Sequence, residues 1–313
     1  MGAVSTVTTV TRLRAIFRSA CSQLLYQKTA LSSSANEKEG EKTMLWNTKE
    51  ESAALDGARM DCVHFGRGGK NLIILPGLSD GLASVKGKAL LLAPPYRLFF
   101  ETYTVWMFSR REPLPQGVTI RDMAADQAAA LRALGIEKTS VLGVSQGGMI
   151  AQLLAAEHPE LVDKLVLAVT APCVNDIIRE RVENWIALAE KGEHQKLMID
   201  TAENSYSEAY LRKYRKLYPL LGGVGRPKSY ERFLANARAI LAFDGRDELG
   251  AIACPTLILG GEEDKIVGAA ASRELHRAIA GSELYLYPAL GHAAYEEEKD
   301  FNARIFRFLE ARL

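Results

Sequence analysis

A serine between two glycines is the strongest chemical signal in the chain. Residues 143–147 read Gly-Val-Ser-Gln-Gly, so Ser145 follows an apolar run and precedes a helical pattern. On such a tight strand-to-helix turn a serine hydroxyl stands clear of the sheet, and the glycines leave room for the neighbouring strand and helix. The pattern therefore indicates a nucleophilic Ser145. The alternative is an ordinary turn whose serine only caps the helix.

The residue after this serine occupies a second useful position. Gln146 would begin a helix, where backbone N–H groups lack intrahelical partners and favour negative charge. We expect its N–H to point toward an oxyanion that develops when Ser145 attacks a carbonyl.

Strand-like and helix-like segments alternate along the chain around this turn. The alternation predicts an α/β fold, with a mostly parallel sheet flanked by helices. We expect strands at residues 59–66, 71–77, 102–109, 139–145, 164–171, 254–261 and 282–288. We expect helices at residues 119–136 and 146–162, and at about 268–280 and 296–312.

One stretch interrupts this alternation and suggests a division of the chain. Residues 174–242 are helical in pattern with no clear strand, so they form an insertion after the strand at residues 164–171, which is counted as the sixth strand of the fold. Residues 44–173 and 243–313 would then make up the core. Residues 1–43 would be an extension outside it.

The extension has a composition of its own. Arginine, serine and threonine are frequent in residues 1–36, which contain no acidic residue. This composition is typical of an organellar transit peptide. We nevertheless expect a disordered extension upstream of Met44 and a cytoplasmic protein, with an organellar location as the alternative if residues 1–43 act as a transit peptide.

Bulk properties exclude several classes of function. The net charge is +1 over 313 residues, without the basic block of a nucleic-acid-binding protein. No apolar run approaches the roughly 20 residues that span a bilayer. The four cysteines form no C-x-x-C pair, which argues against a zinc site and for free thiols in a reducing compartment.

The segment around Ser145 also resembles a known family. Residues 143–167, GVSQGGMIAQLLAAEHPELVDKLVL, are similar to the nucleophile turn and following helix of the α/β-hydrolase fold family. The resemblance runs from about residue 58 to residue 313. It implies the α/β-hydrolase fold, and it implies that the helical insertion is a lid.

The resemblance further implies a catalytic triad. The family places an acid after the seventh strand, where residues 261–264 read Gly-Glu-Glu-Asp, and a histidine after the eighth, where His292 follows a glycine. The chain order Ser145, Asp264, His292 is that of the family. Glu262 and Glu263 remain alternatives for the acid. So does Asp176 after the sixth strand, where some family members keep it.

An oxyanion loop is expected after the third strand. Residues 75–81 read LPGLSDG, with Pro76 where the family commonly has histidine. By the resemblance, the Leu78 N–H is the second oxyanion donor beside Gln146. Ser79 and Asp80 are expected to cap the next helix, although they could line the site.

Together these residues imply a serine hydrolase that cleaves a carboxylic ester through an acyl-enzyme, without metal or cofactor. A lactonase, an enol-lactone hydrolase, an acyltransferase or an aminopeptidase could use the same triad. A binding protein on the same fold could use the pocket without catalysis.

Tyrosines recur every fourth residue within the insertion. Tyr206, Tyr210, Tyr214 and Tyr218 would form a stripe along one face of a helix. The first three are candidates to line a substrate pocket for a medium-sized ester. The alternative is that they pack the insertion against the core.

Overall fold

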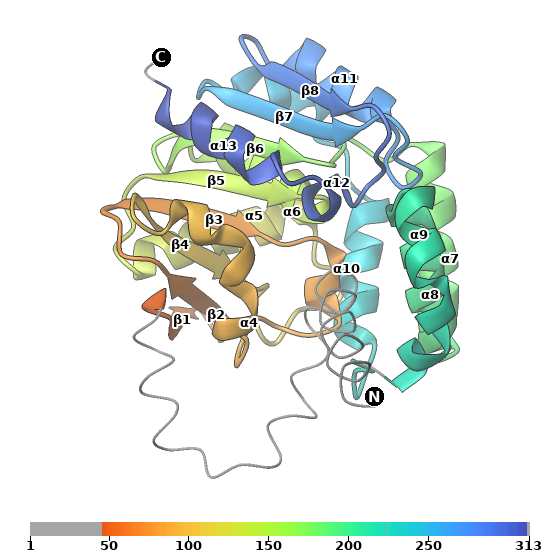
Figure 1. The fold of residues 1–313 in the computed structure, drawn as a ribbon. Coiled ribbons are helices and arrows are strands. Elements are labelled where there is room, and N and C mark those ends of the chain that lie inside the picture. The colour runs from red at the N-terminus through yellow and green to blue at the C-terminus, as the bar shows by residue number, and fades with distance from the viewer. Residues whose placement is uncertain (1–45, 224, 312–313) are drawn as a thin grey trace, which may run out of the picture.

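An eight-stranded, mostly parallel sheet forms the centre of the protein (Figure 1). The computed structural model describes residues 46–223 and 225–311. The strand order is β1-β2-β4-β3-β5-β6-β7-β8, antiparallel at β1–β2 and β2–β4 and parallel elsewhere. The strands are β1 (Lys49–Leu55), β2 (Ala58–Phe65), β3 (Lys70–Leu75), β4 (Tyr103–Phe108), β5 (Thr139–Val144), β6 (Val162–Ala168), β7 (Thr256–Gly261) and β8 (Glu283–Tyr287). The predicted α/β fold is confirmed.

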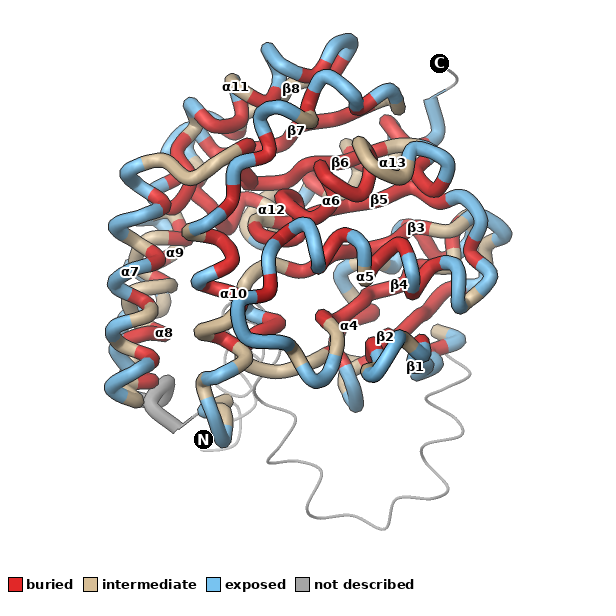
Figure 2. Tube along the Cα trace, turned by 180° about the vertical axis from the view of Figure 1, so that it is seen from behind, coloured by how far each residue is buried: buried red, intermediate tan, exposed pale blue. Residues whose placement is uncertain are grey.

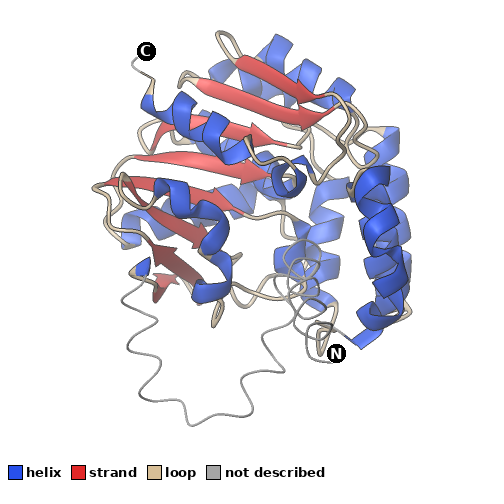
Figure 3. Ribbon diagram, viewed as in Figure 1, coloured by secondary structure: helices blue, strands red, loops and turns tan. Residues whose placement is uncertain are grey.

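Helices cover both faces of this sheet (Figure 3). The α-helices of the core are α4 (Ala89–Leu92), α5 (Ile120–Ala133), α6 (Gln146–Glu157), α11 (Ala269–Ala278), α12 (Ala294–Glu297) and α13 (Phe301–Glu310). Shorter 3-10 helices are η1 (Leu78–Gly81), η2 (Pro94–Phe99) and η4 (Arg246–Ala251). The helix predicted over 296–312 is therefore two helices, α12 and α13.

Alternation of side chains along the strands divides the apolar core into two layers. In β3, Ile73 and Leu75 contribute to the layer under α5, α6 and α11, whereas Leu72 and Ile74 contribute to the layer under α4, η2 and α13. Successive strand residues point to opposite faces, so a strand buried on both sides must be apolar throughout. Figure 2 shows these strands as buried segments across the molecule.

Helices occupy the stretch between β6 and β7 where the insertion is predicted. They are α7 (Asp176–Glu190), α8 (His194–Ser205), α9 (Glu208–Tyr214), η3 (Arg215–Gly223) and α10 (Glu231–Leu241). These helices stand beside the carboxyl ends of the parallel strands (Figure 1). In open α/β sheets that edge is where ligands bind.

The tyrosine stripe does not lie on one helix, so that prediction is wrong. Tyr206 ends α8 in an extended conformation, and Ser207 caps α9 by accepting a hydrogen bond from the Tyr210 N–H. Tyr218 belongs to η3. The helix ends here because Ser205 and Ser207 hydrogen-bond to Ala293 and Glu297 on the core.

Three cysteines, Cys62, Cys173 and Cys254, are free thiols, and Cys21 lies outside the described residues with the whole predicted extension 1–43. Among the described helices, none has the length and apolarity to cross a membrane.

Candidate active site

Loops at the carboxyl ends of β3, β5, β7 and β8 bring the predicted site residues together. Ser145 Oγ lies 3.0 Å from His292 Nε2, and His292 Nδ1 lies 2.9 Å from Asp264 Oδ2. His292 and Asp264 are buried, while Ser145 is partly exposed. A carboxylate can only accept, so Nδ1 donates its proton to Asp264 and Nε2 is left to accept the Ser145 hydroxyl proton.

Ser145 adopts a strained backbone conformation. Its φ is 54° and its ψ is −121°, in the positive-φ region that side chains disfavour. The Ser145 N–H donates to the Ala168 carbonyl of β6, and the Ser145 carbonyl accepts from Thr170 Oγ1 at 2.7 Å. These bonds to β6 and to the segment just after it hold the turn in place, with its hydroxyl directed toward His292.

The two glycines around the serine are required by close backbone approach. A Cβ on Gly147 would lie 1.9 Å from the Leu75 carbonyl oxygen, and one on Gly143 would lie 2.5 Å from the Gly147 oxygen. The obstructing atoms belong to backbone, which cannot rotate away. The expectation that side chains here would collide with strand and helix is therefore confirmed.

Gly147→Ala is expected to lower the free energy of unfolding by about 3 kcal/mol, because α6 must move away from β3 to admit the methyl group. Urea unfolding followed by tryptophan fluorescence measures this loss. Gly250→Ala is the matched control, since a Cβ there has no heavy atom within 4 Å. Equal stability of the two variants would contradict the close approach.

Asp264 is oriented by the backbone of its own loop. Its Oδ1 accepts hydrogen bonds from the N–H groups of Ile266 at 2.8 Å and Val267 at 2.9 Å, which leaves Oδ2 for His292. Burial pushes the pKa of Asp264 upward, but attraction to His292 and these hydrogen bonds outweigh it. The pKa therefore lies below its ordinary value, and the carboxylate stays ionised.

The alternative acids do not reach His292. Glu262 and Glu263 are exposed, and Glu262 pairs with Arg273. Asp176 is also exposed, in the first turn of α7.

The expected oxyanion loop packs directly against the serine. A Cβ on Gly77 would lie 3.3 Å from Ser145 Cβ, so only glycine allows this approach without a shift. Leu78 and Gln146 are the first residues of η1 and α6, where helix geometry leaves the N–H without an intrahelical acceptor. Gln146 follows Ser145 directly, and Leu78 follows the glycine that packs on Ser145.

Ser79 and Asp80 do not cap η1, contrary to expectation. Gly77 holds the N-cap position, and Asp80 is 1% exposed inside the helix. Asp80 accepts hydrogen bonds from Ser109 and Arg110, which follow β4, and from Arg232 on α10. Sequence reasoning missed Arg110 and Arg232, because a charged residue in a polar stretch normally faces solvent.

The candidate tyrosines pack against one another beside the histidine loop, with Tyr206 and Tyr210 stacked and Tyr214 tilted against Tyr210. The ring centroids of Tyr206 and Tyr210 are 4.6 Å apart, and those of Tyr210 and Tyr214 are 4.3 Å apart. The Tyr206 hydroxyl donates to Glu296, and Ala293, next to His292, donates its N–H to the Ser205 carbonyl. The α8–α9 turn is thereby joined to the loop that carries His292.

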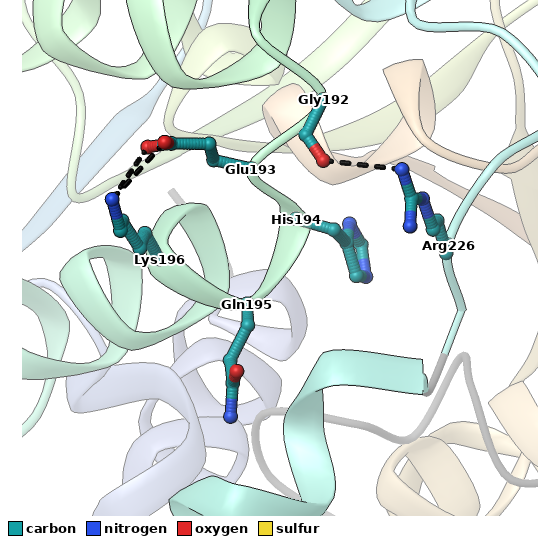
Figure 4. Close-up of a pocket in the computed structure, with 6 residues that line it drawn as sticks. All are labelled: Gly192, Glu193, His194, Gln195, Lys196 and Arg226. Atoms are coloured by element: carbon teal, nitrogen blue, oxygen red, sulfur yellow. Dashed lines mark hydrogen bonds and ion pairs between the residues drawn. The ribbon is translucent and has the colours of Figure 1, made fainter.

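A separate surface depression of about 290 Å³ lies at the start of α8 (Figure 4). It contains none of the candidate site residues. Two charged side chains that line it have partners within the depression: Lys196 forms an ion pair with Glu193, and Arg226 donates a hydrogen bond to the Gly192 carbonyl. Within residues 46–223 and 225–311, no three His, Cys, Asp or Glu side chains cluster closely enough to hold a metal ion.

Comparison with known proteins identifies the family. A family model described as the alpha/beta hydrolase fold matches residues 71–299. RutD of Klebsiella pneumoniae, named provisionally as a carbamate hydrolase, is 32% identical over 203 residues, which cover 62% of this chain and 74% of the relative. The AB hydrolase superfamily protein YisY of Bacillus subtilis is 30% identical over 203 residues, with the same two coverages.

A solved structure has the same architecture. The enol-lactonase of Burkholderia xenovorans superposes with a TM-score of 0.69 at 21% identity, and the match covers 83% of this chain and all of the other. At that identity the likeness shows the fold alone. With the matched family model and the relatives, it leads to one conclusion: the chain belongs to the α/β-hydrolase fold family.

Proposed function

We propose that the protein is a serine hydrolase that cleaves a carboxylic ester through an acyl-enzyme intermediate. The observation that carries this proposal is the continuous hydrogen-bonded line from Ser145 Oγ through His292 to Asp264, at 3.0 and 2.9 Å. A hydroxyl is a weak nucleophile at neutral pH, and this arrangement supplies the base that activates it.

The reaction follows from the direction of these hydrogen bonds. His292 Nε2 takes the Ser145 proton as Oγ attacks the substrate carbonyl, and Asp264 stabilises the imidazolium that forms. The same Nε2–H then protonates the leaving alcohol. A water molecule, deprotonated by His292, releases the acid from Ser145 in a second, similar step.

Charge develops on the carbonyl oxygen during both steps. The N–H groups of Leu78 and Gln146 are proposed to receive it, and each such donor contributes on the order of 3 kcal/mol to the transition state. The close packing of Gly77 on Ser145 supports this assignment, since it brings the Leu78 segment to the nucleophile.

The helical insertion is proposed to act as a fixed lid over this site. It is attached on the histidine side through Ser205 and Ser207, and on the oxyanion side through Arg232. Tyr206 is proposed to pack the lid onto the core through Glu296. Tyr210 and Tyr214, half-buried beside it, are proposed to border the substrate pocket.

The same site would also open a lactone or cleave a carbamate, because both present a carbonyl to the serine. The 32% identity to a relative named as a carbamate hydrolase makes carbamates a substrate class to test beside esters and lactones. Transfer of the acyl group to an alcohol instead of water would need only a different second acceptor.

Labelling with a fluorophosphonate tests the proposal before any substrate is known. The wild-type protein is expected to be labelled, and Ser145→Ala is not, because the probe forms its covalent bond with an activated serine. Label on a residue other than Ser145 would contradict the assignment. If folded wild type takes no label and turns over no ester, lactone or carbamate, a non-catalytic binding role replaces the proposal.

A further inference from the structure

Arg110 is a buried arginine that contacts both segments of the proposed oxyanion hole. It is 1% exposed. Its Nη2 donates to the Pro76 carbonyl at 2.7 Å and to Gln146 Oε1 at 3.2 Å. Pro76 lies two residues before Leu78, and Gln146 follows Ser145. One nitrogen therefore joins the backbone just before Leu78 to the side chain of the residue that carries the second proposed donor.

Asp80 connects this arginine to the insertion. Its Oδ2 accepts from the Arg110 N–H at 3.0 Å and from Arg232 Nη2 at 2.8 Å, and its Oδ1 accepts from Ser109 Oγ at 2.7 Å. The Asp80 carbonyl also accepts from Arg232 Nε. Three segments thus meet at one buried carboxylate: η1, the loop after β4, and helix α10.

Helix α10 also contacts the residue after the nucleophile. Gln146 Nε2 donates to the Asn236 carbonyl at 2.9 Å, and both side chains are fully buried. A Cβ on Gly81 would lie 2.8 Å from Phe233 Cα, so η1 and α10 touch backbone to backbone. Helix α10 therefore contacts both segments that Arg110 joins, the η1 segment and Gln146.

The arginine is costly to keep at this position. Among the described residues no carboxylate forms an ion pair with the Arg110 guanidinium, and its Nε and Nη1 have no hydrogen-bond partner. Burial lowers the pKa of Arg110 to about 10, although the nearby Asp80 opposes that effect. A buried cation with unsatisfied donors lowers the stability of a fold.

We propose that Arg110 is a positioning residue for the oxyanion hole. It sets the Leu78 and Gln146 N–H groups at the separation that the transition state needs. Asp80 and Arg232 link that separation to the position of α10. The inference rests on the proposed function. It gives a reason to retain the buried cation, since small misplacements of such donors cause large losses of rate.

Arg110→Met keeps the volume of the side chain and removes both hydrogen bonds. Its second-order rate constant for fluorophosphonate labelling is expected to fall about 100-fold, because the phosphoryl oxygen of the probe occupies the oxyanion hole. For an ester substrate kcat falls by the same factor, while KM stays within about threefold. Arg110→Lys, which can still reach one acceptor, is expected to lose only about tenfold.

The pH profile separates positioning from general damage. In the plot of labelling rate against pH, the midpoint of the acid limb is expected to be the same in Arg110→Met and wild type, because the contacts between His292 and Asp264 are untouched. Only the maximal rate is expected to fall. Arg111→Met is the matched control. Arg111 is the next residue, pairs with Asp126 and donates to the Asp56 carbonyl, and its side chain contacts no segment of the site. Its labelling rate is expected to stay within about threefold of wild type.

Each outcome decides the inference. Labelling of Arg110→Met at the rate of Arg111→Met overturns it and leaves the proposed function standing. Wild type that takes no label and turns over no substrate overturns the proposed function, and the inference falls with it. If Arg110→Met does not fold, Arg110→Lys decides instead: a rate within about threefold of wild type overturns the inference, and a loss of about tenfold or more supports it.

Discussion

Ser145→Ala is expected to reduce kcat by about 10⁶-fold on any ester that wild type hydrolyses. The variant keeps the proposed oxyanion donors and His292 but has no atom to form the acyl-enzyme. Residual turnover would come from direct attack by water, which those groups can still assist. KM stays close to the wild-type value, because the hydroxyl contributes little to binding in the ground state.

The fold of this variant is expected to stay intact. The turn is held by the Ser145 backbone, through Ala168 and Thr170, and these bonds do not involve the hydroxyl. Its Tm is expected to lie within about 3 °C of wild type. Ser52→Ala on the exposed strand β1 is the control for a serine without a role.

A stricter test compares the losses of kcat in the single variants of Ser145 and His292 with the loss in the double variant. His292→Ala alone is expected to cost about as much as Ser145→Ala, and the double variant no more than either, because the two side chains act as one device. Two independent losses that multiply would contradict a shared mechanism. So would Ser145→Ala turnover above about 1% of wild type.

The sheet could be predicted where its strands are buried on both faces. The segments at β3, β5, β6 and β7 each contain an apolar run, and burial on both sides requires that pattern. Strand β1 was missed because its sequence, KEESAAL, carries almost no apolar signal: only Ala53 is buried. Its pairing with β2 places it at the edge, which no local pattern encodes.

Local patterns failed wherever contacts with distant residues set the structure. The four-residue spacing of the tyrosines predicts one helix, yet tertiary hydrogen bonds to Ala293 and Glu297 break it at Tyr206. A serine followed by Glu-Ala-Tyr at residue 207 was a readable cap signal. The network of Asp80, Arg110 and Arg232 had no such signal, because only the fold shows that Asp80 and Arg110 are buried and that Arg232 reaches them.

The proximity of Ser145, Asp264 and His292 had a better basis in sequence. Each follows a strand of one parallel sheet, and the carboxyl ends of parallel strands meet at one edge. The resemblance to the family implies which three loops carry these residues. The choice of Asp264 over its neighbours depends on backbone N–H groups that orient one carboxylate oxygen, which a sequence does not display.

Asp264→Asn is expected to reduce kcat by about 10⁴-fold, although the substitution changes a single atom type. Ile266 and Val267 donate their N–H groups to Oδ1, so the amide oxygen of asparagine takes that place. The NH₂ group then faces His292 Nδ1, which must accept. The proton of the imidazole moves to Nε2, and His292 can no longer take a proton from Ser145.

The same substitution is expected to change the acid stability of the protein. The pKa of Asp264 in the fold lies below its ordinary value of 3.8, because His292 and the loop N–H groups outweigh burial. A carboxylate with a lowered folded pKa contributes stability above 3.8, and that contribution is lost as the pH falls from there through the folded pKa. Asp264→Asn lacks this loss. Its free energy of unfolding in urea should therefore fall less steeply than that of wild type below about pH 4.

Glu263→Gln and Asp176→Asn are the matched controls for both measurements. Each removes an exposed carboxylate that does not reach His292, so kcat is expected to stay within about threefold of wild type. A severe loss of kcat in Asp176→Asn beside a mild one in Asp264→Asn would make Asp176, on α7, the third member of the triad. His292 would then have to turn away from the partner it has at 2.9 Å, which makes the comparison a direct test of this hydrogen bond.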